Sequence, residues 1–412
     1  MGLLRQLREI STELSPPSSL GTSTSVRRTL APRIILYAQI LTAKAGFSNI
    51  SLTEDGYMRV GVLTFHHTYN YGAVMQAFAL TETIRGLGHS VEILNYDSNN
   101  NDYYLTFEND LILKTRPPFL NLHREKYRRK DTKFEEFIGK YLPATSPLRT
   151  KSELDAVASE LDVIVVGSDE VWRLYEGWYP AYFLDFGPQK LRRVSYAASF
   201  GGTSDPGAHR DELTRSLEQF NVIMVRDENS QRIVTDLLGV VPDMTFDPVL
   251  LNALGRLEIE APAPSTSTNS VLVYSERQLA PREVLAVRRK AKELNARIIA
   301  LGFPHWFADE NIIDAGPLDF LAAVRSAKVI ATGTFHGVVF GLLYEKQLLV
   351  FATKKKANKV ASLLGEICLL SKFGDLSGEA IDYSVTTPRI QEIRERSLGL
   401  LSDSIVGSSS AP

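Results

Sequence analysis

Among the residues of this sequence that can do chemistry, His336 has the most informative position. A short apolar run at residues 329–331 is broken at residues 332–334, and a helical pattern begins at Phe335. This predicts that His336 lies at the carboxyl end of a buried parallel strand and the amino end of a helix, where open α/β sheets bind ligands. A helix start favours an anion, to which a histidine can give a proton. Alternatively, His336 only caps the helix or fills a packing gap.

A second polar cluster follows another apolar run. Residues 161–166 read as a buried strand, which ends in Gly167-Ser168-Asp169-Glu170-Val171-Trp172. Asp169 could orient a sugar hydroxyl or hold a catalytic group, and the ring of Trp172 could stack on a sugar. The alternative is that Asp169 simply caps the next helix. The residues alone leave both interpretations open.

Arg226 directly follows a third apolar run, at residues 222–225. A guanidinium at the end of a strand can bind a phosphate or a carboxylate through two parallel hydrogen bonds. The alternative is a surface ion pair with Asp227 or Glu228, which would contribute little stability.

The loop after the first strand is polar and aromatic. Residues 66–73 join a strand at residues 59–65 to a helix at residues 74–87, and Gly72 stands at the start of that helix. Such a loop can hold a ligand, although it lacks the glycine spacing of a dinucleotide-binding fingerprint. Asn70 is the candidate ligand contact in this loop.

The composition is that of a globular protein without a dominant charged partner. The chain has 412 residues, 44% of them hydrophobic, and a formal net charge of −2 from 46 basic and 48 acidic residues. This balance argues against nucleic acid or an anionic membrane as the main partner. The one cysteine, Cys368, excludes an internal disulfide, fits a reducing cytoplasm and is expected in the core. No HExxH-type spacing calls for a metal, and no apolar stretch is long enough to span a membrane.

Strands and helices alternate along most of the chain. This alternation predicts an α/β protein with two Rossmann-like domains that face a cleft. Ser, Thr and Pro are abundant in residues 11–29, so residues 1–57 are expected to form a flexible N-terminal extension. The alternative is a short amphipathic helix around residues 32–46. Residues 403–412, rich in Ser and Gly, are expected to be a disordered tail.

A Pro-, Ser- and Thr-rich segment at residues 258–269 is the best linker in the chain. It separates a predicted N-terminal domain, residues 58–262, from a predicted C-terminal domain, residues 270–402. A cleft between two domains is the default place for a ligand, and it could gather the polar residues from the strand ends.

Five motifs, in order along the chain, together resemble those of the polysaccharide pyruvyl transferase family. Each motif alone is weak, but the ordered set is specific and covers about residues 58–375. Residues 1–57 have no counterpart. The motifs are Asn70-Tyr71-Gly72-Ala73 with residues 76–80, Gly167-Ser168-Asp169-Glu170-Val171-Trp172, Val225-Arg226-Asp227 with Ser230, Asp247-Pro248-Val249-Leu250, and Thr334-Phe335-His336-Gly337.

The resemblance implies a two-domain enzyme of the GT-B kind. Members transfer the pyruvyl unit of phosphoenolpyruvate to sugar hydroxyls of a surface polysaccharide or its precursor, which usually leaves a pyruvate ketal. His336 would then be the general acid, and Arg226 would bind the donor anion. A lysine after the next strand would be a second anion ligand, a role for which the candidates are Lys355, Lys356 and Lys359.

This chain departs from the family at one site. Many members carry Arg-Leu-His where this chain has Thr334-Phe335-His336. The absent arginine bears on how the donor is held, and therefore on the identity of the donor.

The chemistry of phosphoenolpyruvate suits the candidate residues. Its carboxylate and phosphate need cations and helix-start N–H groups. Its methylene carbon must be protonated when a sugar hydroxyl attacks C2, and a positioned acid contributes roughly 10²–10⁴-fold to the rate. Asp169 is the candidate base for that hydroxyl. The other residues expected to contact substrate are Asn70, Tyr71, Gly72, Ser168, Trp172 and Thr334.

The expected partners are phosphoenolpyruvate, a donor substrate that makes a cofactor unnecessary, and a sugar acceptor. The acceptor could be lipid-linked, which would bring a cytoplasmic enzyme to the membrane. Two other functions stay open. One is a GT-B glycosyltransferase of exopolysaccharide synthesis, in which Arg226 and the lysines would hold the diphosphate of a nucleotide sugar. The other is a carbohydrate-binding module without catalytic activity.

Overall fold

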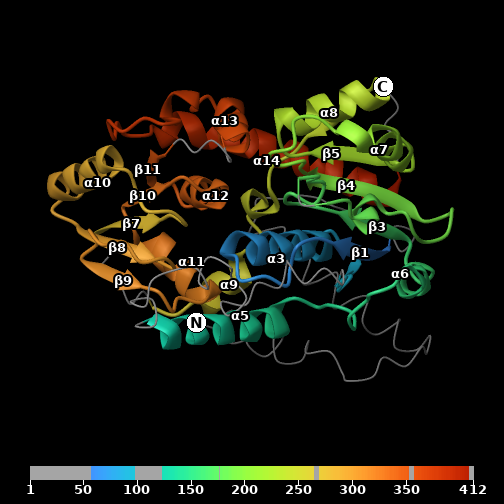
Figure 1. Ribbon diagram of the computed structural model, residues 1–412, viewed down its shortest axis with the longest axis horizontal. Helices are drawn as coiled ribbons and strands as arrows, with labels where there is room; N and C mark the ends of the chain where they lie inside the picture. Colours follow the sequence, from blue (N-terminus) through green and yellow to red (C-terminus); the bar gives the residue numbers. More distant parts are fainter. Residues whose placement is uncertain (1–56, 98–122, 176, 264–268, 352–356, 408–412) are drawn as a thin grey trace. The chain divides into compact units, whose positions relative to one another are not determined.

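Parallel strands and helices alternate through the described part of the chain (Figure 1). The computed structural model describes residues 57–97, 123–175, 177–263, 269–351 and 357–407. All of these residues belong to one compact unit, Ile50–Pro412. Except for Tyr57, the predicted N-terminal extension lies outside the described residues.

The first sheet has six parallel strands in the order β2-β1-β3-β4-β5-β6. Its central strand β3 is a continuous apolar run, Val-Ile-Val-Val, in which every residue is buried, as expected for a strand that is covered on both faces. The strands are β1 (Arg59–Leu63), β2 (Ser90–Ile93), β3 (Val163–Val166), β4 (Arg192–Ala198), β5 (Val222–Val225) and β6 (Asp243–Met244). The helices in this part are α3 (Tyr71–Gly86), α5 (Arg124–Tyr141), α6 (Lys151–Ala158), α7 (Arg210–Leu217), α8 (Glu228–Leu238) and α9 (Gly255–Glu260).

The second sheet has five parallel strands in the order β11-β10-β7-β8-β9. The strands are β7 (Ser270–Tyr274), β8 (Arg297–Leu301), β9 (Glu310–Ile312), β10 (Val329–Thr332) and β11 (Gln347–Val350). The helices are α10 (Pro281–Glu293), α11 (Pro317–Ser326), α12 (Phe335–Leu343) and α13 (Ala357–Glu366). The predicted α/β class with two Rossmann-like sheets is therefore confirmed.

The registers of the two sheets place polar strand ends next to one another. In the first sheet, Leu63 pairs with Val166, so the loops after β1 and β3 leave the sheet side by side. In the second sheet, Thr332 at the end of β10 pairs with Tyr274 at the end of β7. The polar segments named by the sequence thus follow neighbouring strands at the carboxyl edge, where such sheets bind ligands.

The last helix, α14 (Tyr383–Val406), packs against the first sheet although it follows the second one in the chain. The N–H of Phe246 donates a hydrogen bond to Oγ of Ser397 (3.1 Å), and the side chain of Ile405 is fully buried. Because of this packing, the helix continues through residues 403–406, which the sequence assigns to a disordered tail. The domain boundaries drawn from the sequence stay a prediction.

The structure differs from two local predictions. The first residues of the predicted linker, 258–260, lie in helix α9, whereas residues 264–268 lie outside the described part. The prediction that Cys368 is a core residue is wrong. Cys368 is exposed, because the chain leaves α13 there in a left-handed turn with φ 59°. Within the described residues, no helix combines the length and the apolar character needed to cross a membrane.

Candidate active site

A pocket of about 170 Å³ lies where strand ends of the two sheets meet. It gathers Asn70, Asp169, Thr334, His336 and Lys359, five of the residues that the sequence singled out. Further lining residues are Ala73, Glu170 and Arg173 from the part around the first sheet, and Tyr274, Glu276 and Phe335 from the part around the second.

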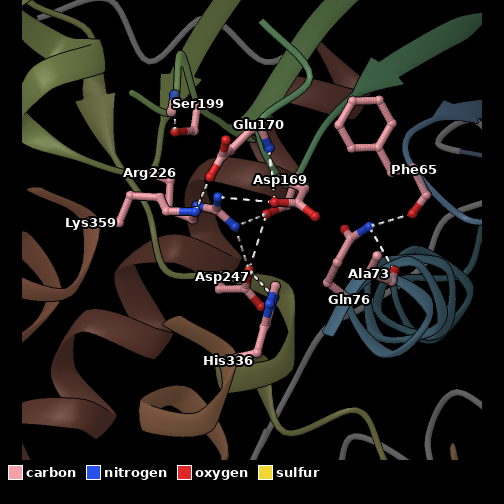
Figure 2. Close-up of polar contacts among 12 residues, drawn as sticks. Phe65, Ala73, Gln76, Asp169, Glu170, Ser199, Arg226, Asp247, His336 and Lys359 are labelled. Atoms are coloured by element: carbon pink, nitrogen blue, oxygen red, sulfur yellow. Dashed lines mark hydrogen bonds and ion pairs between the residues drawn. The ribbon is translucent and has the colours of Figure 1, made fainter. Parts of the chain in front are cut away.

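His336 is held against Asp247 (Figure 2). His336 is the second residue of α12, and Thr334 caps this helix by accepting a hydrogen bond from the N–H of Gly337 (3.0 Å). Nε2 of His336 lies 3.3 Å from Oδ2 of Asp247, close enough for an ion pair when the ring is protonated, although the two form no hydrogen bond. This contact fixes which ring nitrogen faces the carboxylate.

Asp247 is fully buried and rigidly placed. It begins the 3₁₀ turn Pro248–Leu251, and its Oδ1 accepts a hydrogen bond from the N–H of Val249 (3.1 Å). Burial alone would raise the pKa of Asp247, but the neighbouring His336 and Arg226 lower this pKa to about 2. Asp247 is therefore a carboxylate at neutral pH and can carry the counter-charge of a protonated His336.

Gly72 gives His336 the space to lie where it does. Gly72 is the second residue of α3, and a Cβ added to it would lie 2.0 Å from Nδ1 and 2.2 Å from Cγ of His336. No real Cβ tolerates such a distance. Gly72, predicted to contact substrate, does not line the pocket; the structure shows a packing role for it, since the imidazole occupies the volume that any other side chain would need.

Arg226 is buried and bridges two carboxylates. Its Nη2 lies 3.2 Å from Oδ1 of Asp169 and its Nη1 lies 3.1 Å from Oδ2 of Asp247, while only 2% of its side chain is exposed. Its guanidinium also lies over the ring of Phe335, 4.4 Å from the centroid, in a cation–π contact. Burial would lower the pKa of Arg226, but Asp169 and Asp247 raise it, so the guanidinium stays charged. Arg226 thus contacts pocket residues without lining the pocket itself.

Asp169 lies between this guanidinium and the pocket. Its backbone is left-handed (φ 75°), and its Oδ1 accepts hydrogen bonds from the N–H of Glu170 (2.9 Å) and from Arg226. Burial raises the pKa of Asp169, but Arg226, His336 and Lys359 together hold it below the usual value. Ser168 is fully buried, and its Oγ donates to Oδ2 of Asp247 (3.2 Å), so it supports the carboxylates from behind.

Lys359 enters the pocket from α13 and forms an ion pair with Glu170. The hydroxyl of Tyr175 donates to the other oxygen of the Glu170 carboxylate. Burial raises the pKa of Glu170, but Lys359 brings the pKa below the usual value. Of the three candidate lysines, Lys359 therefore reaches the pocket, whereas Lys355 and Lys356 lie outside the described residues.

Besides Arg226, Gly72 and Ser168, two more predicted substrate contacts do not line the pocket. Trp172 is fully buried, stacks on Phe183 and donates from Nε1 to the carbonyl oxygen of Tyr182 (2.9 Å). Tyr71 is also buried, stacks on Phe320 and donates from its hydroxyl to the carbonyl oxygen of Ala315 (2.7 Å). Both rings are core residues here, and Trp172 offers no free face to a sugar.

Asn70 and Thr334 combine two roles. Oδ1 of Asn70 accepts a hydrogen bond from the N–H of Ala73 (3.2 Å), so Asn70 caps α3 as Thr334 caps α12. Both residues also line the pocket. Two helix starts with N–H groups therefore border one pocket, an arrangement that favours a bound anion.

Gln76 holds the pocket wall together. Its side-chain Nε2 donates to the carbonyl oxygens of Phe65 (3.1 Å) and Ala73 (2.9 Å), which ties the chain after β1 to α3 (Figure 2). Sequence reasoning assigns no individual role to Gln76, Glu170, Arg173 or Asp247. Asp247 was visible as part of a motif, but a lone Asp-Pro pair does not reveal that its carboxylate faces a histidine from the other sheet.

The site thus combines a candidate proton donor, His336 with its counter-ion Asp247, and cations beside two helix starts. Within the described part of the chain, no group of three or more His, Cys, Asp or Glu side chains is arranged to hold a metal ion. The arrangement can bind a small anion and protonate it.

The family model described as polysaccharide pyruvyl transferase matches residues 70–355, which is more than half of the chain. The chain therefore belongs to the polysaccharide pyruvyl transferase family. A comparison with curated protein sequences gives no match.

Solved structures resemble the chain only distantly. UGT89C1 of Arabidopsis thaliana, complexed with UDP-L-rhamnose, is 10% identical with a TM-score of 0.45 and covers 85% of this chain and 99% of its own. UDP-N-acetylglucosamine 2-epimerase from Rickettsia bellii is 12% identical with a TM-score of 0.40, again over 85% and 99%. The UDP-GlcNAc 2-epimerase of Methanocaldococcus jannaschii is 10% identical with a TM-score of 0.43, over 83% and 92%. Likenesses at this level carry no argument about the function of this chain.

Proposed function

We propose that the chain transfers the pyruvyl group of phosphoenolpyruvate to sugar hydroxyls of a surface polysaccharide or its precursor and forms a pyruvate ketal. Family membership supports a transferase that acts on a polysaccharide. The observation that carries the choice of donor is the contact between His336 and buried Asp247 in a pocket that also holds Lys359 and Arg173. A carboxylate- and phosphate-bearing donor needs such cations and such an acid.

In the proposed reaction, a sugar hydroxyl oxygen bonds to C2 of phosphoenolpyruvate while the methylene carbon takes a proton from His336. Phosphate then leaves C2 with the electrons of the broken C–O bond. A second sugar hydroxyl bonds to C2 and closes the ketal, and its proton passes to the departing phosphate. Since Nε2 of His336 faces Asp247, we assign the donated proton to Nδ1, the nitrogen beside Gly72. Asp247 balances the charge of the ring before the proton leaves.

The donor anion is assigned to Lys359 and Arg173, the two cations that line the pocket. Arg173 offers a guanidinium at a site whose Thr334-Phe335-His336 motif lacks one. A direct contact between Arg226 and the donor would require its guanidinium to leave Asp169 or Asp247. We therefore propose that Arg226 acts mainly by holding these two carboxylates in place.

Asp169 is the proposed base for the incoming hydroxyl. Its lowered pKa keeps it ionised at neutral pH, so it can orient a hydroxyl and accept its proton as the C–O bond forms. The acceptor could be lipid-linked. The one cysteine and the phosphorylated donor fit a reaction in the cytoplasm.

The test does not require the acceptor to be known. A host strain that lacks this protein is complemented with the wild type, with His336→Ala or with His209→Ala, and its surface glycan is analysed by mass spectrometry. His209 is a control because its side chain is 39% exposed and it does not line the pocket. The wild type and His209→Ala should add a pyruvate ketal to the glycan, and His336→Ala should not. The melting temperature of His336→Ala should be close to that of the wild type, which shows that the variant is folded.

Wild-type levels of pyruvate with His336→Ala would remove this residue from the mechanism. If the wild-type protein adds no pyruvate to the glycan, the proposal that phosphoenolpyruvate is the donor is wrong. A thermal-shift titration then compares phosphoenolpyruvate with nucleotide sugars, because a ligand stabilises the folded protein according to its own affinity. Stabilisation by nucleotide sugars alone would favour the glycosyltransferase alternative.

A further inference from the structure

Helix α10 follows β7 in the second sheet (Figure 1). Several exposed basic residues make one face of this helix strongly basic. Arg282, Leu285, Arg288, Arg289 and Lys292 are all exposed, and their spacing of three and four residues puts them on one side of the helix. The exposed ring of Trp306 lies next to this side, since the guanidinium of Arg288 is 5.1 Å from its centroid. We call these six residues the α10 face.

Within the described part of the chain, none of the four cations of the α10 face forms an ion pair within 4 Å, although Arg282 lies near enough to Glu283 to lower the pKa of that carboxyl. The acids nearest in sequence are engaged elsewhere. Glu283 is buried and pairs with Arg277, Glu293 pairs with Lys290, and Glu310 pairs with Arg297. Among the described residues, Arg282, Arg288 and Lys292 therefore face solvent without an ion pair. Arg289 keeps its charge but donates from Nη2 to the carbonyl oxygens of Leu376 and Ser377.

Two large apolar side chains stand among these cations. Trp306 is 72% exposed and Leu285 is 67% exposed. Scattered single apolar residues on a surface need no explanation, but a tryptophan with a cation over its ring and a leucine between arginines form one mixed patch. Trp and Arg side chains with this mixture of polar and apolar character are favoured at the headgroup level of a bilayer.

We propose that the α10 face docks on the surface of an anionic lipid bilayer. The four cations complement anionic headgroups, each contributing about fivefold to binding at low salt, while Trp306 and Leu285 enter the boundary between headgroups and acyl chains. A soluble polyanion would satisfy the cations but would leave both apolar side chains in water. The near-neutral net charge of the whole chain argues against a membrane as the main partner. Salt, however, screens charges more than about 10 Å away, so the local charge of this patch, and not the net charge of the chain, decides whether it is attracted to a membrane.

The α10 face lies near the pocket, so docking on a membrane would bring the pocket close to an acceptor at the membrane surface. Glu276, in the loop between β7 and α10, lines the pocket, and Nε2 of Gln278 in the same loop donates to the carbonyl oxygen of Pro304 (2.7 Å), two residues before Trp306. The pocket and the α10 face are thus joined by two short loops at one edge of the second sheet. An acceptor at a membrane surface would be presented close to this edge. The docking itself does not depend on the proposed donor.

The experiment uses the full chain and two kinds of vesicle, phosphatidylcholine alone and phosphatidylcholine with phosphatidylglycerol. Sedimentation should show binding to the anionic vesicles only, and 0.5 M NaCl should weaken it. Arg288→Ala/Arg289→Ala should bind roughly 25-fold more weakly, about fivefold for each charge removed. The matched control, Arg210→Ala/Arg215→Ala on α7, removes two exposed cations from another helix and should bind like the wild type.

Tryptophan fluorescence adds a readout of depth. The chain has three tryptophans; Trp172 is fully buried and Trp178 is half-buried, so brominated lipids should quench mainly Trp306, and the quenching should be lost in Trp306→Phe. Equal binding to both vesicles, or unchanged binding of Arg288→Ala/Arg289→Ala, would overturn the proposal. Binding to a soluble acidic polymer of equal charge without quenching by brominated lipid would also overturn it, in favour of a polyanion.

Discussion

Gly72 offers the sharpest test of the site at the scale of a single residue. The reason for glycine is space, because an added Cβ would lie 2.0 Å from Nδ1 of His336. Gly72→Ala should therefore displace the imidazole from Asp247 and lower the rate of pyruvyl transfer by about 100-fold, since misplacement by about 1 Å can cost this much. Alanine is a better helix former than glycine, so α3 should keep its stability.

The matched control is Gly86→Ala in the same helix, where an added Cβ would meet no atom within 4 Å. Transfer is measured as the pyruvate content of the complemented glycan, and the ring environments of the 7 histidines are followed by NMR. Gly86→Ala should match the wild type in both measurements. If Gly72→Ala kept more than a third of the wild-type pyruvate with unchanged histidine signals, the packing role of Gly72 would be rejected.

Residue types at strand ends could be predicted, but the direction of their side chains could not. The strand-to-helix pattern correctly placed His336 and Asp169 at one pocket, because the carboxyl edge of a parallel sheet collects the residues that follow its strands. The same pattern could not show that Trp172, three residues after Asp169, turns into the core. It also could not show that Asp247, from a turn after the two-residue strand β6, meets a histidine 89 positions later, 3.3 Å away.

At the scale of elements, α14, the last helix in the described part of the chain, packs against the first sheet and is expected to stabilise it. Leu401 is fully buried in this helix, and truncating a buried leucine removes apolar burial and leaves a cavity. Leu401→Ala should therefore lower the free energy of unfolding by about 2–5 kcal/mol, measured by urea denaturation. Val385→Ala is the control in the same helix, since Val385 is 70% exposed, and it should change this free energy by no more than about 0.5 kcal/mol. Equal effects of both changes would mean that α14 does not stabilise the sheet.

The helical periodicity at residues 390–401 predicts a last helix but does not predict which sheet this helix packs against. A helix that follows the second sheet in sequence is expected to pack on it, because consecutive elements are usually neighbours. Its return to the first sheet depends on contacts such as the one between Phe246 and Ser397, which are 151 positions apart. Local pattern carries no information about contacts of this range.

At the scale of the whole molecule, the walls of the pocket come from both sheets. Asp169 and Arg173 follow β3, whereas His336 follows β10 and Lys359 belongs to α13. A donor that contacts both walls binds only when both walls are folded. Its binding should therefore make local unfolding of either wall less favourable. A ligand that contacts one wall should protect that wall alone.

Hydrogen exchange can measure this link directly. Saturating phosphoenolpyruvate should slow amide exchange both in the segment 167–173 and in α12 (Phe335–Leu343), by at least about tenfold if the donor exceeds its dissociation constant by that factor. Inorganic phosphate at the same concentration is the control ligand, and it should protect less because it lacks the carboxylate. Lys359→Ala should weaken the protection in both segments at once, since its ammonium group reaches across the pocket to Glu170. Protection confined to one segment would show that the donor does not bridge the two walls, and the assignment of the donor site to this pocket would fail.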